Sequence, residues 1–270
     1  MKKYRETARV LENVRIGTDI FSLRLETEKI AAAAKPGQFV TVYTKDNARL
    51  LPRPISVCEA DGERGILRLV FRIAGEGTRD FSRLEEGSSV EIVGPLGNGF
   101  PMPSEALCTK AQATNRPLRA AVIGGGIGIP PMLALAQQLM RAEVDVTAVL
   151  GYRDELFLLE DFPCGSAVAT EDGSFGTKGN VLDAIRAQSV AADVIYACGP
   201  APMLRALKQY ADGHDIECWL SMEEKMACGI GACLSCVCRS TEVDAHSQVK
   251  NKRVCTEGPV FRSTEIELGN

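Results

Sequence analysis

Cysteines towards the end of this sequence form its densest group of reactive side chains. Cys228, Cys233 and Cys236 follow the spacing C-x4-C-x2-C, and Cys255 comes after 18 intervening residues. Two glycines lie between the first two cysteines, where a loop that wraps inorganic sulfide needs backbone able to adopt positive φ and turn its N–H groups inward. The spacing predicts four thiolates around one small inorganic cluster.

A fifth cysteine in the same segment, Cys238, leaves the fourth ligand open. The run resembles the ligation pattern of plant-type [2Fe–2S] proteins. Cys255 follows a segment long enough for a hairpin, whereas Cys238 would have to fold straight back from Cys236, so we favour Cys255. A structural zinc site usually pairs its ligands as C-x2-C knuckles, and here only Cys233 and Cys236 have that spacing. We therefore expect a [2Fe–2S] cluster bound by Cys228, Cys233, Cys236 and Cys255, with zinc as the alternative.

The composition indicates a folded protein with no general affinity for polyanions. A hydrophobic content of 45% in 270 residues is ample for real cores, and a net charge of −4 gives no attraction to nucleic acid or an anionic membrane. The first residues are mixed and charged, unlike a signal peptide, and no 18-residue apolar run follows, so we expect a cytoplasmic protein. There the ten cysteines should be mostly reduced, which favours metal binding over disulfides.

Three regions differ in their pattern of apolar residues. Residues 5–95 form short alternating segments separated by glycine and proline turns, which predicts a small antiparallel barrel or sandwich. After a proline-rich stretch without a clear period, apolar strands alternate with amphipathic helices, as in a parallel sheet of βαβ units. We expect an N-terminal antiparallel β-barrel (1–101), a linker or insertion (102–117), a parallel-sheet α/β domain (118–216) and a small C-terminal domain held by its metal (217–270).

Two segments of the barrel region could bind an anion. Arg53-Pro54-Ile55-Ser56 places an arginine, a bidentate partner for phosphate, beside a small hydroxyl. After the strand Val70-Phe71-Arg72, Gly77 and Thr78 stand at the expected start of a short helix, where free N–H groups can meet an anion. An ordinary turn or helix cap would explain each segment alone. In this order, however, they are similar to the flavin-binding segments of the ferredoxin reductase superfamily.

Gly124, Gly125, Gly126 and Gly128 follow a buried strand and precede a helix that begins with prolines. The run departs from the fingerprint G-x-G-x-x-G because proline replaces the last glycine, yet proline suits the first turn of a helix. A glycine turn needed only for packing is the alternative. Four glycines in five residues after a buried strand favour the close approach of a dinucleotide, so we predict nicotinamide binding here. The form G-G-G-x-G-x-x-P is also similar to that of ferredoxin reductases.

Cys198, in the sequence Cys-Gly-Pro, ends an apolar strand at the edge where ligands of open α/β sheets bind. Ferredoxin reductases place a cysteine of this motif near the nicotinamide ring, but a buried thiol at a strand end is equally consistent with the sequence. Hydride transfer is the chemistry of the cofactor, so Cys198 should position at most. The polar segment 170–179 could meet a ribose or form a surface turn, and it does not distinguish NAD from NADP.

The three groups of motifs together resemble the electron-transfer subunits of NAD-dependent dihydroorotate dehydrogenase B over nearly the whole chain. The most specific parts are residues 221–238 and 254–261, while an insertion near 104–117 and a long segment between Cys236 and Cys255 depart from the pattern. The resemblance implies that the cofactors are FAD, NAD and a [2Fe–2S] cluster. It implies FAD contacts from Arg53, Pro54, Ile55, Ser56, Val70, Phe71, Arg72, Gly77 and Thr78, nicotinamide contacts from Gly124, Gly125, Gly126, Gly128 and Cys198, and a hydrogen bond from Glu223 near either ring.

The resemblance also implies a relay between two kinds of subunit. Dihydroorotate would be oxidised at FMN on a catalytic partner, and electrons would pass through the [2Fe–2S] cluster to FAD and then to NAD, in pyrimidine (UMP) biosynthesis. The implied assembly is a heterotetramer with two copies of each subunit. FAD must lie between the other carriers because nicotinamide accepts only a hydride, whereas the cluster carries one electron at a time. The alternatives are a flavin reductase subunit of another complex, of the sulfite reductase or hydrogenase type, and a zinc-stabilised interaction module without redox work.

Overall fold

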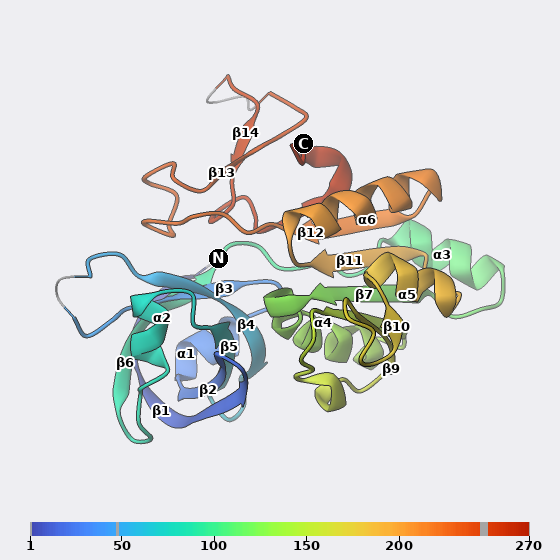
Figure 1. The fold of residues 1–270 in the computed structure, drawn as a ribbon. Helices are drawn as coiled ribbons and strands as arrows, with labels where there is room; N and C mark the ends of the chain where they lie inside the picture. The colour runs from blue at the N-terminus through green and yellow to red at the C-terminus, as the bar shows by residue number, and fades with distance from the viewer. Residues whose placement is uncertain (1, 47–48, 244–247, 270) are drawn as a thin grey trace.

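The computed structural model describes residues 2–46, 49–243 and 248–269. A closed β-barrel and a mostly parallel sheet lie side by side, and the cysteine-rich segment lies over them in the view of Figure 1. Within the described ranges, no helix has the length and apolar character needed to cross a bilayer. The predicted combination of an antiparallel barrel with a parallel-sheet domain is confirmed.

The barrel closes because each strand pairs antiparallel with both neighbours. Alternate residues of these strands point inward, and Ile30 and Phe81 from two short helices complete the interior. The order around the barrel is β1 (Tyr4–Gly17), β2 (Ile20–Glu26), β5 (Ile66–Arg72), β4 (Arg53–Asp61), β3 (Phe39–Val42) and β6 (Ser89–Leu96), with α1 (Glu28–Ala33) and α2 (Glu76–Phe81) beside them.

Helix α3 (Glu105–Ala113) lies in the stretch 102–117, in which we expected a linker or insertion. The Ser104 hydroxyl caps it by accepting a hydrogen bond from the Leu107 N–H at 3.4 Å. Ala111 is its single buried residue. A helix with so little buried surface has no apolar stripe, which explains why the sequence shows no helical period there.

The sheet has parallel neighbours throughout except at one edge, where the last strand runs antiparallel. Its order is β10 (Thr177–Lys178), β9 (Gly165–Thr170), β8 (Asp145–Tyr152), β7 (Arg119–Gly125), β11 (Val194–Cys198), β12 (Glu217–Ser221) and β15 (Val260–Arg262). Short 3-10 turns follow several strands: η1 (Gly126–Gly128), η2 (Leu159–Asp161) and η3 (Ser263–Glu265). The parallel order is the one that βαβ units impose.

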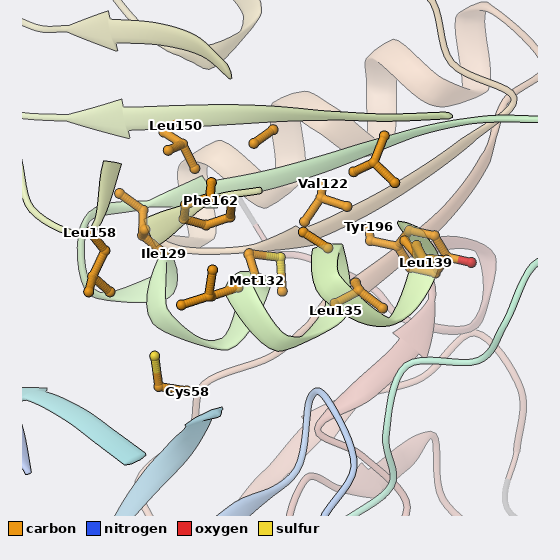
Figure 2. Close-up of a cluster of buried hydrophobic side chains, with 14 of the residues drawn as sticks. Cys58, Val122, Ile129, Met132, Leu135, Leu139, Leu150, Leu158, Phe162 and Tyr196 are labelled. Carbon is orange, nitrogen blue, oxygen red and sulfur yellow. The ribbon is translucent and has the colours of Figure 1, made fainter. Parts of the chain in front are cut away.

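Helix α4 (Pro130–Arg141) covers the sheet face that meets the barrel. Its Met132 is fully buried beside Val122 of β7, and Cys58 of β4 lies on the other side of the helix (Figure 2). Polar contacts surround this core: the Arg68 guanidinium on β5 reaches Asp161 at 2.6 Å across the boundary. The barrel and the sheet therefore share one continuous core.

The opposite face of the sheet carries α5 (Val181–Ala187), α6 (Ala201–Gly213) and the cysteine-rich segment. That segment contains one small hairpin, β13 (Val237–Arg239) paired with β14 (Asn251–Arg253). Its buried cysteines pack into the same cluster as Leu204 and Leu207 of α6.

The strand β12 belongs to the parallel sheet, whereas we expected residues 217–270 to form a separate unit. Trp219 on β12 lies opposite Tyr196 on β11, and β15 then extends the sheet on the other side of β12. This strand begins with Glu217 and ends with Ser221, so its three apolar residues are too few to separate it from the segment that follows. Along the chain, the cysteine-rich segment thus lies between two strands of the sheet, β12 and β15.

Candidate functional site

The loop from Cys228 to Cys236 has the backbone that inward-turned N–H groups require. Gly229 and Gly231 have φ of +66° and +91°, the left-handed region that favours glycine. A Cβ on Gly229 would lie 2.8 Å from the Thr41 side chain of β3. Glycine is therefore needed here both for the turn and for the close contact of the loop with the barrel.

The four predicted ligands form two pairs. The Cys228 thiol is hydrogen-bonded to Cys233, and the Cys236 thiol to Cys255. The Cys255 N–H also donates to Cys236 Sγ at 3.4 Å. In the described part of the chain, no three Cys, His, Asp or Glu side chains gather around a single metal position. Two pairs of thiols instead fit a cluster of two irons, in which each iron takes two thiolates.

Cys228 is the thiol most easily ionised. Partial burial opposes ionisation, but the Ile230 N–H, the Cys233 thiol and the Cys233 and Ala232 N–H groups donate hydrogen bonds that lower its pKa to about 6. The Ala232 N–H lies 3.3 Å from Cys228 Sγ. A thiolate is the form that binds iron, so these backbone donors favour the ligand state.

Cys255 and Cys238 differ in their neighbours. Burial and the hydrogen bond with Cys236 raise the Cys255 pKa to about 12, and the Gly231 N–H donates to its sulfur. Cys238 is also buried, which raises its pKa to about 11, and the nearby Glu224 carboxylate and Cys236 thiol raise it as well. The hydrogen bonds between Cys236 and Cys255 favour Cys255 as the fourth ligand, as the spacing predicts.

Arg53 and Gly77 meet at the start of α2. A Cβ on Gly77 would lie 2.6 Å from Arg53 Nε, so the guanidinium lies directly on the helix backbone. Its Nη1 donates to the Leu51 carbonyl at 2.5 Å, which fixes the side chain. The structure thereby brings together two residues predicted from separate motifs and places a guanidinium beside the first turn of α2.

Other predicted flavin residues differ from what the motifs suggest. The Thr78 hydroxyl accepts from the Ala74 and Gly75 N–H groups at 2.9 and 3.2 Å, so it caps α2 instead of facing a ligand. Val70 and Phe71 are 3% and 2% exposed, because they pack into the cores on either side of β5. These three residues can offer a ligand mainly backbone groups. Arg72 is exposed, and Pro54, Ile55 and Ser56 are half-buried along β4.

The glycine loop is mostly explained by packing within the chain. A Cβ on Gly124 would lie 2.7 Å from Ile129 Cα, one on Gly125 2.5 Å from Met203 Sδ, and one on Gly128 2.5 Å from the Cys198 carbonyl carbon. Gly126 differs, with φ of +52° and nothing within 4 Å of an added Cβ. Gly126 is therefore the position of the four that faces open space.

Cys198 lies beside this loop at the carboxyl end of β11, between Gly124 on β7 and Ser221 on β12. Burial raises its pKa to about 12, and the nearby Glu223 carboxylate raises it further, against a hydrogen bond from Ser221. The thiol is thus neutral, which agrees with a positioning role. Ser221 lies in the segment 221–238 that carries the resemblance, but its place beside Cys198 depends on the register of two strands, which the sequence does not show.

The polar segment 170–179 forms many hydrogen bonds among its own side chains and backbone. Thr170 Oγ1 accepts from the Phe175 N–H at 3.1 Å and donates to the Phe175 carbonyl at 2.8 Å. Hydrogen bonds from the Ser174 N–H and hydroxyl lower the pKa of the Asp172 carboxyl. The turn is self-contained, and the Phe175 side chain is exposed.

Residues 97–98, just after β6, are a further group that the sequence analysis missed. The Asn98 side chain bonds to the backbone of Glu257 and Val260, immediately after Cys255. No local pattern reveals a contact across about 160 residues, so only the fold could bring this asparagine to the cysteine-rich segment.

Comparisons with known proteins match two regions of this chain to protein families. Residues 7–100 match the family described as oxidoreductase FAD-binding domain, and residues 223–267 match the iron-sulfur cluster binding domain of dihydroorotate dehydrogenase B. A chain from the structure of an NADH-dependent reduced ferredoxin-NADP oxidoreductase, reported for flavin-based electron bifurcation, has a TM-score of 0.83 at 26% identity and covers 97% of this chain and 90% of its own.

Two curated relatives carry the same name. The dihydroorotate dehydrogenase B (NAD(+)) electron transfer subunit of Geobacillus kaustophilus (strain HTA426) is 40% identical over 98% of this chain and 99% of its own length. The subunit of that name from Listeria monocytogenes (strain ATCC BAA-679 / EGD-e) is 40% identical over 96% and 98%. The chain therefore belongs to the family of electron transfer subunits of NAD(+)-dependent dihydroorotate dehydrogenase B.

Proposed function

We propose that this chain passes electrons from a catalytic partner that oxidises dihydroorotate at FMN to NAD, using its own [2Fe–2S] cluster and FAD. The observation that supports this most directly is the pairing of four thiols, three of them on a loop whose Gly229 contacts Thr41 of β3. β3 pairs with β4, the strand that begins at Arg53 and contains Ser56. When bound, the cluster would supply one-electron transfer, and FAD would connect it to hydride transfer.

The barrel residues would bind and orient FAD. Arg53, already held against the start of α2, would pair with the pyrophosphate, and Ser56 would hydrogen-bond the edge of the ring. Pro54, Ile55 and the backbone of Val70 to Thr78 would line the rest of the site. The buried Val70 and Phe71 side chains would keep β5 rigid beneath it.

The carboxyl end of the sheet would receive the nicotinamide. Gly126 is open to a ligand, and Gly124, Gly125 and Gly128 let this loop pack closely against Ile129, Met203 and Cys198, which shapes that space. The neutral Cys198, held by Ser221, would orient the ring, with Glu223 near by. This edge is where ligands of open α/β sheets bind.

The cluster loop would also face the catalytic partner. Cys233 is exposed, and Ile230 and Leu234 on either side of it are 52% and 61% exposed. Exposed apolar residues around a redox site are suited to a protein interface. We propose a heterotetramer with two copies of each subunit, in the cytoplasm, where the ten free cysteines would stay reduced.

Co-expression with the catalytic partner, followed by metal and flavin analysis, tests the proposal. We expect about one FAD and two irons per chain, and NAD reduction by dihydroorotate only in the complex. A colourless zinc-containing chain would contradict any redox function. A chain with FAD and iron that reduces NAD with another donor, but never with dihydroorotate, would support another redox complex.

A further inference from the structure

Asn98 joins the end of the barrel to the turn that follows Cys255. Its Nδ2 donates to the carbonyls of Glu257 at 3.0 Å and Val260 at 2.7 Å, and its Oδ1 accepts from the Val260 N–H at 2.9 Å. The Asn98 backbone N–H donates to the Gly258 carbonyl at 2.6 Å. One residue thus makes four hydrogen bonds to a four-residue stretch of the cysteine-rich segment.

The turn that receives these bonds is itself rigid. Glu257 Oε2 accepts from the Arg253 N–H at 2.8 Å and from Arg253 Nε at 3.0 Å. The Thr256 N–H donates to the Arg253 carbonyl at 3.1 Å. Cys255 lies within this hydrogen-bonded turn, so its backbone is connected to residues 257–260.

The other side of the contact leads directly to the strands proposed to bind FAD. Gln38 is fully buried, and its Nε2 donates to the Gly97 carbonyl at 2.7 Å. Gln38 precedes Phe39 of β3, which lies opposite Ser56 of β4. A Cβ on Gly97 would lie 3.1 Å from the Phe39 ring and 2.5 Å from Pro259. A continuous set of contacts, partly buried and partly at the surface, therefore runs from Ser56 to Cys255.

We propose that Asn98 is a positioning residue that fixes the Cys255 ligand, and with it the cluster, relative to the FAD-binding strands. This inference rests on the proposed function. Electron tunnelling slows steeply as the distance between carriers grows, so a fixed separation is what a relay needs. The four hydrogen bonds set this separation from the barrel side, independently of the thiols that bind the metal.

The test compares Asn98→Ala with a matched control, Asn13→Ala, in the complex with its catalytic partner. Asn13 also donates from its side-chain amide to two backbone carbonyls, those of Phe81 and Leu84 at 3.0 and 2.9 Å, but within the barrel. Loss of stability should be similar in the two variants. Asn98→Asp is a second variant, of nearly the same shape, which keeps the acceptor but loses both donors.

We expect Asn98→Ala and Asn98→Asp to retain FAD and iron but to transfer electrons between flavin and cluster about tenfold more slowly. The reduction potential and electron paramagnetic resonance signal of the cluster should change as well, while reduction of FAD by NADH does not. Asn13→Ala should alter none of these. An unchanged transfer rate and signal in the Asn98 variants, or the same changes in Asn13→Ala, would overturn the inference. A wild-type chain without FAD or cluster would instead contradict the proposed function.

Discussion

Two glycine-rich loops carry the predicted chemistry, and the structure explains their glycines differently. In the loop 124–128, a Cβ on Gly124 or Gly128 would collide with backbone at Ile129 or Cys198, and one on Gly125 would displace the Met203 side chain. In the loop 228–236, both glycines have positive φ, and the N–H of Gly231 donates to the Cys255 sulfur. A glycine run is thus weak support for a ligand unless its N–H groups are aimed at one.

Replacing Cys255 with Ser should have the largest effect, because it removes one thiol from the pair with Cys236. We expect loss of the cluster absorbance and of iron, while FAD remains bound. The comparison variant is Cys238→Ser, whose thiol lies outside the two pairs, and it should retain its iron. If Cys238→Ser lost its iron and Cys255→Ser kept its cluster, Cys238 would be the fourth ligand and Cys255 would not.

Replacing Arg53 with Ala tests whether the cysteine loop keeps its cluster when the neighbouring barrel strands have lost FAD. Losing a charge-assisted hydrogen bond to phosphate should weaken FAD binding by about tenfold to a hundredfold. Gel filtration followed by absorbance spectroscopy should show FAD released and the cluster band unchanged. Arg24→Ala, at an exposed arginine of β2, is the control. Stoichiometric FAD in Arg53→Ala would refute the assignment.

Replacing Gly128 with Ala tests the packing explanation of the glycine loop. The new Cβ would lie 2.5 Å from the Cys198 carbonyl carbon and 2.7 Å from Gly199 Cα, both in backbone that cannot move easily. We expect a loss of about 3 kcal/mol in the free energy of unfolding, measured by denaturant titration. Gly126→Ala meets no atom within 4 Å and should cost only about 1 kcal/mol, from its positive φ. Equal losses would show that packing does not distinguish the two glycines.

Local patterns in the sequence predicted the elements that carry most of the candidate site. Alternation within the strands identified the barrel, and the change to helical periods identified the parallel sheet. The cysteine spacing picked out the four thiols that the structure arranges as two pairs. These features depend on residues close in sequence, which is why they could be read without coordinates.

Contacts between distant residues could not be predicted in the same way. Asn98 has no motif around it that reports its bonds to residues 257–260. The Thr78 hydroxyl looks available in the sequence, yet it caps its own helix. Helix α3 lacks an apolar stripe because it buries almost nothing. The deciding partner is a distant segment for Asn98, the backbone just before its own helix for Thr78, and solvent for α3.

The smallest effect should come from the opposite end of the strands that carry Gly124 and Cys198. There the Arg116 guanidinium binds both oxygens of Asp193 at 2.6 and 2.7 Å, and the Arg119 N–H adds a third bond at 3.0 Å. The hydrogen bonds from Arg116, opposed by burial, lower the Asp193 pKa to about 2. The pKa of Asp193 is lower in the folded protein than in the unfolded chain, so its carboxylate stabilises the sheet above about pH 4. This stabilisation is lost as the pH falls to about 2.

Asp193→Asn should therefore lower the free energy of unfolding by about 2 kcal/mol near neutral pH, and the difference from the wild type should shrink as the medium is acidified. Denaturant titrations at several pH values measure it. Asp183→Asn, whose carboxylate pairs with Arg186 within the exposed part of α5, should show a much smaller change. A difference that stays constant down to about pH 2 would mean that the charge of Asp193 does not hold these strands together. The order of these strands would then rest on the apolar cores that cover both faces of the sheet, which do not depend on pH.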